Sequence, residues 1–339
     1  MKKLLIYILL GLSTFSNAQS LSISSPDQYQ KVTEPAVIKA GPVEFLNYQI
    51  AQDKSPVVEY YISKTSKKAP LILYIQGSGC SPVFFSSGSD SHGSTVYNLV
   101  PIAALGRYSV MVVKKPFTTD KPVADTKNHC AREFNEYFTA ENWAKSVRVA
   151  FEHALQLPWI DQKKTLLLGM SEGATIASMI AANEKRVTHV ALLGATGPTQ
   201  LFDFVVAAYR TSTNDDEIQV KLDELEEQRR KIAASPDSAD DFAWGHPYKR
   251  WSSFFRTSST QNVLGSSAKV YLVSGMQDQS VPILSTESMA SELIALGRDV
   301  TVRRIPRAQH NLVPEGQPWT VSDPEYGRIL EWFGSTHKD

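Results

Sequence analysis

A serine stands at the centre of the motif Gly169-Met170-Ser171-Glu172-Gly173, between an apolar run (TLLL, residues 165–168) and a segment of small residues (ATIASMIAAN, residues 174–183). This order predicts a buried strand, a sharp turn and a helix, and the two glycines permit the close backbone approach that such a turn requires. The turn would expose the Ser171 hydroxyl, with the N–H groups of the helix start facing any negative charge that forms beside it. We therefore predict that Ser171 is the nucleophile of an acyl-transfer reaction. The alternative is a glycine-rich turn with an incidental serine.

A serine hydroxyl needs a base to take its proton, and His310 is the histidine best placed for that role. It lies in RIPRAQHNL (residues 304–312), just after the last apolar run of the chain. The alternative is a surface histidine without a catalytic role. The other histidines precede the nucleophile or belong to a predicted helix, a strand start, an inserted segment or the terminal tail: His92, His129, His153, His189, His246 and His337.

The imidazole in turn needs an acid to orient it, and we predict Asp278 for this role. Asp278 follows the apolar run KVYLVSG (residues 269–275) in a short loop, MQDQSVP, that leads to the next helix. Its alternative role is that of a turn-forming or helix-capping aspartate. Asp323, beyond the histidine, and Glu287, inside a predicted helix, are weaker candidates.

These residues must be positioned by strands, and continuous apolar runs recur along the chain between helical segments. Runs of this length fit strands buried on both faces, and their alternation with helices predicts an α/β fold with a mostly parallel central sheet flanked by helices. Alternating stretches at 43–50 and 57–62 predict antiparallel strands at one edge of that sheet. The apolar runs are LILYI (71–75), YSVMVV (108–113), TLLLGM (165–170), HVALLG (189–194), KVYLVSG (269–275) and VTVRRI (300–305).

The predicted helices are residues 140–155, 173–183 and 288–296. Residues from about 198 to 264 interrupt this rhythm with a charged helix, IQVKLDELEEQRRKIAA, and an aromatic segment, FAWGHPYKRWSSFF. So long a block between two strands predicts a helical cap inserted in the domain. Its aromatic side chains either line an apolar site or seal the cap to the core: Phe202, Phe204, Trp244, Trp251, Phe254 and Phe255.

With this strand–turn–helix motif and the order Ser171, Asp278, His310, the chain resembles the α/β-hydrolase superfamily over residues 41–335. The resemblance implies an oxyanion-hole loop after the first parallel strand, where Gln76-Gly77-Ser78-Gly79-Cys80 stands in place of the His-Gly pair of many members. By position, the backbone N–H groups of Ser78 and Glu172 would hold the oxyanion, with Gly79 as the alternative donor. The alternative for the loop is an ordinary tight glycine turn.

The N-terminus predicts export. Lys2 and Lys3 precede an apolar run, Leu4–Leu12, too short to span a bilayer, and Ala18 fits a small-residue cleavage rule. We expect residues 1–18 to be a signal peptide, residues 19–339 to form the hydrolase domain, and the mature protein to be periplasmic or secreted without stable membrane insertion. A membrane anchor is the alternative.

The composition is that of a globular protein, with 42% hydrophobic and 21% charged residues. Removing Lys2 and Lys3 leaves 33 basic residues (35 minus 2) against 35 acidic ones, a balance that does not favour nucleic acid as a partner. Export makes a disulfide between the two cysteines, Cys80 and Cys130, plausible, with two reduced thiols as the alternative.

Taken together, these patterns predict a serine hydrolase that cleaves an ester or similar acyl bond through an acyl-enzyme intermediate. The expected partner is a small acyl substrate or a peptide. A peptidase or amidase of the same fold is the nearest alternative, and a non-catalytic binding protein is a more distant one. No motif of the sequence predicts a metal or another cofactor.

Overall fold

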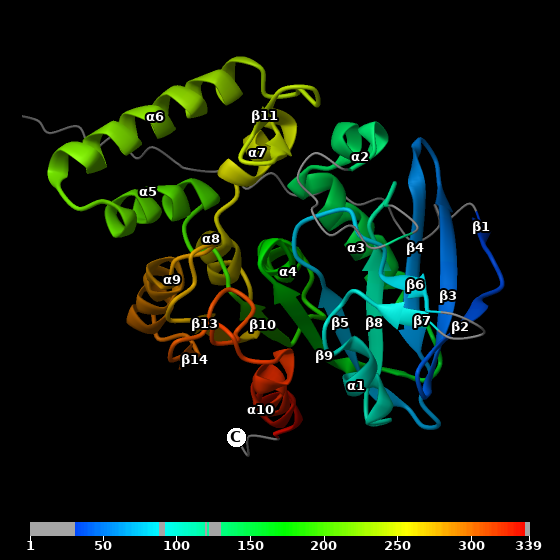
Figure 1. Cartoon of the computed structure of the whole chain (residues 1–339). Helices are drawn as coiled ribbons and strands as arrows, with labels where there is room; N and C mark the ends of the chain where they lie inside the picture. Colours follow the sequence, from blue (N-terminus) through cyan, green and yellow to red (C-terminus); the bar gives the residue numbers. More distant parts are fainter. Residues whose placement is uncertain (1–30, 88–91, 119–120, 122–129, 336–339) are drawn as a thin grey trace, which may run out of the picture.

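The computed structural model of the chain describes residues 31–87, 92–118, 121 and 130–335. The predicted signal peptide therefore lies outside the described residues. Within them, the central element is a ten-stranded sheet whose strands follow the order β1-β3-β4-β8-β5-β9-β10-β13-β14, with β2 paired to β3 (Figure 1).

The sheet is parallel from β8 to β14 and antiparallel at the edge formed by β1 to β4, as the sequence predicts. Each of the six apolar runs coincides with a strand of the parallel part, except that Tyr108 and Gly194 lie just outside β8 and β10. The strands are β1 (Lys31–Val32), β2 (Ala36–Ala40), β3 (Val43–Gln52), β4 (Ser55–Ser63), β5 (Ala69–Ile75), β8 (Ser109–Lys114), β9 (Ile160–Met170), β10 (His189–Leu193), β13 (Lys269–Gly275) and β14 (Val300–Ile305). A separate hairpin joins β6 (Phe84–Ser86) to β7 (His92–Ser94).

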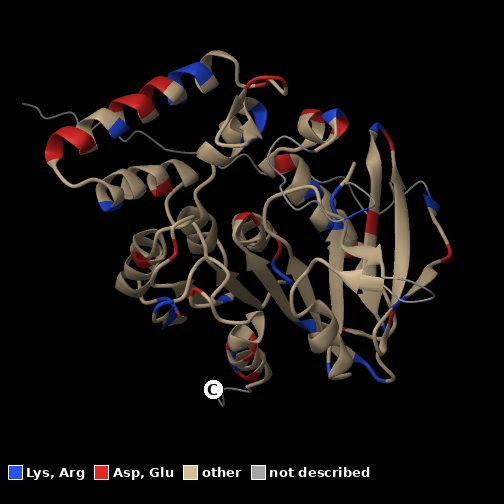
Figure 2. Ribbon diagram, in the orientation of Figure 1, with Lys and Arg blue, Asp and Glu red and all other residues tan. Residues whose placement is uncertain are grey.

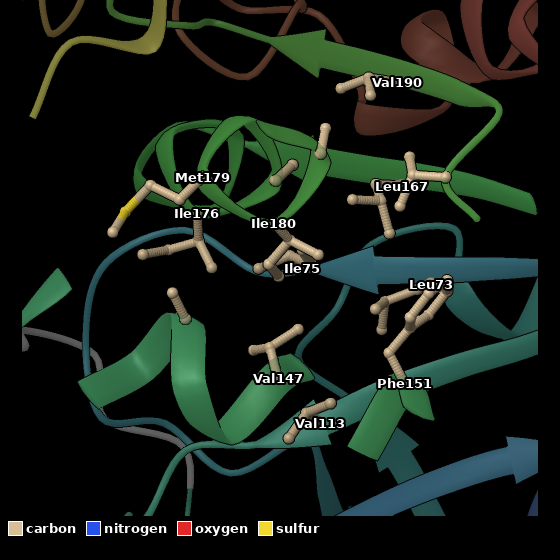
Figure 3. Packing of buried hydrophobic residues seen from close by; sticks show 14 of the residues in the cluster. Leu73, Ile75, Val113, Val147, Phe151, Leu167, Ile176, Met179, Ile180 and Val190 are labelled. Carbon is tan, nitrogen blue, oxygen red and sulfur yellow. The ribbon is translucent and has the colours of Figure 1, made fainter. Parts of the chain in front are cut away.

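Helices cover both faces of the sheet, and alternate residues of its central strands are buried on opposite sides. Leu167 of β9 belongs to the core on one side of the sheet, where α3 (Ala140–Ala154), α4 (Glu172–Asn183) and α9 (Ile283–Ala295) pack. Figure 3 shows part of this core. Leu166 and Leu168 contact the opposite side, under α1 (Leu99–Ala104) and α10 (Asp323–Gly334). Because successive strand residues point to opposite faces, one apolar run supplies two cores. The short helices α2 (Arg132–Tyr137) and η2 (Trp319–Ser322) precede α3 and α10 along the chain.

Between β10 and β13 the chain leaves the sheet and forms α5 (Gln200–Thr211), α6 (Asp215–Ala234), the short pair β11 (Phe242–Ala243) and β12 (His246–Pro247), α7 (Tyr248–Phe255) and α8 (Ser259–Leu264). We call residues 200–264 the α5–α8 segment. In Figure 1, α5, α6 and α7 lie together at the opposite side of the molecule from β3. Charged residues run along α6 in Figure 2, and Ile232 is its buried residue.

No helix of the described part of the chain combines the length and the apolar character that crossing a membrane requires.

Candidate active site

Ser171 forms a sharp turn between β9 and α4. Its backbone angles are φ 56° and ψ −122°, a combination that residues other than glycine rarely adopt. The Ser171 N–H donates to the carbonyl of Leu193 on β10 at 2.8 Å. A Cβ atom on Gly173 would lie 2.1 Å from the Ile75 carbonyl oxygen, so a glycine is needed for α4 to pack against β5. The turn thus places Ser171 at the carboxyl end of the parallel strands.

His310 and Asp278 contact each other directly. His310 lies in the loop that follows β14, and its Nδ1 is 2.7 Å from Asp278 Oδ2. The other carboxyl oxygen of Asp278 accepts hydrogen bonds from the backbone N–H groups of Ser280 (2.8 Å) and Val281 (2.9 Å). Asp278 is fully buried, whereas the His310 side chain is 27% exposed. This division of acceptors fixes the carboxylate and leaves one oxygen to orient the imidazole.

The end of β10 brings Ser171 and His310 to the same place. Gly194 follows Leu193, the hydrogen-bond partner of Ser171, and a Cβ atom on Gly194 would lie 3.1 Å from His310 Cε1. The positive φ of Gly194, 54°, also favours glycine here. Among the described residues no hydrogen bond joins the Ser171 hydroxyl to His310; such bonds often shorten only when substrate binds.

A cavity of about 310 Å³ opens at Ser171. Ser78, the proposed oxyanion-hole residue, lines the same cavity, whereas Gly79 does not. The α5–α8 segment supplies much of the remaining wall, including three of the six aromatic residues singled out from the sequence. The other lining residues are Gln200, Asp203, Phe204, Ala207, Trp244, His246, Arg250, Trp251, Gln279, Ser280 and Val281.

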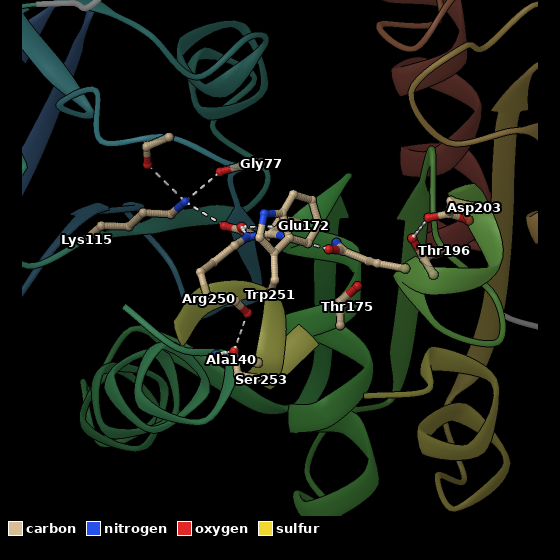
Figure 4. A network of polar contacts seen from close by, with 12 residues as sticks. Gly77, Lys115, Ala140, Glu172, Thr175, Thr196, Asp203, Arg250, Trp251 and Ser253 are labelled. Atoms are coloured by element: carbon tan, nitrogen blue, oxygen red, sulfur yellow. Dashed lines mark hydrogen bonds and ion pairs between the residues drawn. The ribbon is translucent and has the colours of Figure 1, made fainter. Parts of the chain in front are cut away.

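A buried ionic cluster, which was not predicted from the sequence, adjoins the cavity. The Glu172 carboxylate accepts from Lys115 Nζ at 2.9 Å and from Arg250 at 2.9 and 3.2 Å, as Figure 4 shows. All three side chains are at most 4% exposed. Burial by itself raises the pKa of the Glu172 carboxyl, but the charges of Lys115 and Arg250 outweigh it and lower the pKa to about 2. Glu172 is therefore ionised.

A second buried carboxyl, Asp203 in the first turn of α5, lines the cavity. Its two oxygens contact the hydroxyls of Thr196 (2.6 Å) and Ser285. Burial raises the pKa of this carboxyl to about 7, although both hydroxyl contacts lower it. Asp203 lies in the insertion predicted from the sequence, but no sequence pattern distinguishes it from the other acidic residues there.

Cys80 and Cys130 form a disulfide, which confirms the predicted pairing; their Cα atoms lie 5.7 Å apart. The bridge ties the turn that carries Ser78 to Cys130, which lies two residues before the start of α2. Among the described residues, no group of three or more His, Cys, Asp or Glu side chains is placed to hold a metal ion.

The sequence profile of the prolyl oligopeptidase family matches residues 133–338, more than half of the chain. This range contains Ser171, Asp278 and His310. None of the curated proteins matches the chain closely enough to count as a relative.

Several solved structures of hydrolases share the fold. Acylaminoacyl peptidase of Pyrococcus horikoshii has a TM-score of 0.60 at 14% identity over 87% of this chain and 42% of the peptidase. Acetyl xylan esterase 1 of a Thermoanaerobacterium species has a TM-score of 0.53 at 13% identity over 90% of this chain and 88% of the esterase. Dipeptidyl peptidase 4 of Porphyromonas gingivalis has a TM-score of 0.52 at 13% identity over 88% of this chain and 35% of that protein. The chain thus spans less than half the length of the two peptidases.

Proposed function

Because the chain belongs to the prolyl oligopeptidase family of serine hydrolases, in the α/β-hydrolase superfamily, we propose that Ser171, His310 and Asp278 are its catalytic triad. The observation that supports this most directly is the 2.7 Å contact of His310 Nδ1 with a carboxyl oxygen of Asp278. This contact lies at the carboxyl edge of the parallel strands, where Ser171 also lies. The contact directs the second imidazole nitrogen, Nε2, away from the acid, where a base acting on serine would need it.

In the proposed reaction the Ser171 oxygen attacks the acyl carbonyl while His310 takes the hydroxyl proton. The backbone N–H groups of Ser78 and Glu172 stabilise the oxyanion of the tetrahedral intermediate. His310 then returns the proton to the leaving group, which gives an acyl-enzyme. Water, activated by His310, hydrolyses the acyl-enzyme and restores the free Ser171 hydroxyl.

We propose an ester of a small acyl group as the substrate. The cavity volume of about 310 Å³ lies at the lower end of the range for small-molecule sites, and both polar and aromatic side chains line it. Cleavage of an amide or peptide is the second candidate, favoured by the family match and by the likeness to the acylaminoacyl and dipeptidyl peptidases.

We further propose that the α5–α8 segment is a cap over the site, since its residues line the cavity at Ser171. Export of the protein remains a proposal as well. It is supported by the Cys80–Cys130 disulfide, because such bonds persist mainly in oxidising compartments.

The test of the proposed nucleophile is covalent labelling with a fluorophosphonate, followed by mass spectrometry of the labelled peptide. We expect one adduct, on Ser171, that is lost in Ser171→Ala and kept in the control Ser335→Ala, whose serine is exposed at the end of α10. Labelling of another serine in the folded wild type would refute the assignment.

Pairs of esters and amides that share one acyl group then decide between the two candidate substrates. We expect a higher kcat/KM for the ester of each pair, after allowance for the rates without enzyme. Preference for the amides would favour the peptidase alternative.

A further inference from the structure

Lys115 is a fully buried lysine beside the proposed oxyanion turn. It directly follows β8, and its Nζ donates to the carbonyl oxygens of Gly77 (2.7 Å) and Gly79 (3.2 Å) and to the Glu172 carboxylate (2.9 Å). These partners can only accept, so the three contacts use all three hydrogens of a protonated ammonium group. Figure 4 shows this arrangement, which binds the turn after β5 to the helix that begins behind Ser171.

The charge of Glu172 explains why a cation is needed at this position. A carboxylate one residue after the nucleophile would repel the negative charge that forms on the acyl oxygen, most strongly in a site that excludes water. Lys115 and Arg250 give the cluster two positive charges against the one negative charge of Glu172. Within the cluster the charge of the acidic side chain is therefore more than neutralised.

The contact with Gly77 has a more specific consequence. The Gly77 carbonyl and the Ser78 N–H belong to the same peptide group, which is planar. A hydrogen bond from Lys115 to the oxygen at one end therefore fixes the direction of the N–H at the other end. It also polarises the group, because linked hydrogen bonds strengthen one another. Ser78 lines the cavity together with Ser171.

We infer that Lys115 is a positioning residue of the oxyanion hole, which orients and polarises the Gly77–Ser78 peptide so that the Ser78 N–H binds the oxyanion formed at Ser171. Glu172 fixes the ammonium from the other side, and its own N–H is the second proposed donor, so one cluster holds both donors in place. This inference rests on the proposed function.

The test compares Lys115→Met with the control Lys114→Met in the full, oxidised protein. Lys114 is the adjacent lysine, pairs with Glu59 at 3.2 Å and is 28% exposed, so its removal deletes the same charge without touching the turn. Lys115→Met leaves Glu172 paired with Arg250, so no buried carboxylate loses its only partner. Lys115→Gln, which keeps N–H donors without the charge, is the second variant if the methionine variant does not fold.

The measurements are kcat and KM for an ester and the Ki values of two inhibitors. The first inhibitor is an aryl trifluoromethyl ketone. The second is the methyl ether of the corresponding alcohol, which cannot form an adduct with serine. The ketone forms a tetrahedral oxyanion on Ser171 and so reports on the oxyanion hole. We expect Lys115→Met to lower kcat/KM and to weaken ketone binding by the same factor, on the order of a hundredfold. KM and ether binding should change less than twofold, Lys115→Gln should fall between wild type and Lys115→Met, and Lys114→Met should match the wild type.

A folded Lys115 variant that binds the ketone within twofold of the wild type would overturn the inference. So would equal weakening of ketone and ether, since that indicates a general loss of packing. Failure of the proposed function is recognised separately, because the wild type would then neither react with a fluorophosphonate at Ser171 nor hydrolyse any ester.

Discussion

Asp203 should make the protein less stable as the pH rises through neutrality. Asp203 is 6% exposed, and burial raises the pKa of its carboxyl from the ordinary 3.8 to about 7. Between these two pH values the folded state holds a proton that the unfolded state has lost. The free energy of unfolding therefore falls as the pH rises from about 4 to about 7, and this contribution is greatest below pH 4.

The size of the effect follows from the pKa difference of about 3 units, which corresponds to about 4 kcal/mol over the whole range. Between pH 5 and pH 8 alone, the linkage relation leaves a loss of about 3 kcal/mol. Asp203→Asn keeps the size of the side chain but does not titrate, so the variant should lose about 3 kcal/mol less than the wild type over this interval.

Urea unfolding of both proteins at pH 5 and pH 8 measures this difference, and other titrating groups cancel in the comparison. Asp299→Asn serves as the control, because its carboxyl is 63% exposed, and it should follow the wild type. A wild type and an Asp203→Asn variant with the same dependence on pH would refute the reasoning, as would a variant that loses more stability than the wild type.

Two further predictions concern the acid and the disulfide. Asp278→Asn should lower kcat by roughly 10⁴-fold with little change in KM, because it disturbs the imidazole tautomer more than substrate contacts. In the same hydrolysis assay the control Asp323→Asn should be close to the wild type. The Asp323 carboxyl accepts from Tyr97 and Asn98. The opposite pattern would show that the acid is misassigned. Replacing Cys80 and Cys130 together by serine opens a link between residues 50 apart and should lower the unfolding free energy by about 4 kcal/mol in the chain-entropy model. Urea unfolding without reductant tests this, and a loss below about 1 kcal/mol would contradict it.

Most strands of the parallel sheet could be predicted from the sequence because they are buried on both faces, whereas β14 at its edge is only partly buried. A strand in that position needs an unbroken apolar run, as in residues 71–75 and 165–170, and such runs stand out in a single sequence. The element ends were less predictable. β9 begins at Ile160, before the polar residues 161–164, and α9 begins at Ile283 rather than at the predicted 288. Polar residues, 161–164 in β9 and 285–288 in α9, interrupt the apolar pattern that would mark these two ends.

The proposed triad could also be located from the sequence, for a reason of topology. Ser171, Asp278 and His310 each follow a different parallel strand, and the carboxyl ends of parallel strands meet at one edge of a sheet. Chain order and strand prediction therefore suffice to bring the three residues together. The 2.7 Å distance between His310 and Asp278 agrees with that expectation.

The partners of Glu172 could not be found in this way. Lys115 and Arg250 are 57 and 78 residues from Glu172 in the chain, and Arg250 lies on a helix outside the sheet, whose position no strand pattern specifies. Lys115 has the same residue type as its neighbour Lys114, which pairs with Glu59 and stays partly exposed.

These two lysines differ only in where the chain places their side chains at the end of β8. Lys114 binds the Glu59 carboxylate on the neighbouring strand, whereas Lys115 donates to the carbonyls of the oxyanion turn. An acidic residue directly after the nucleophile was nevertheless a usable signal. A carboxylate there suits the start of a helix but opposes a nearby oxyanion, so a hydrolase that retains it must bury a cation against it.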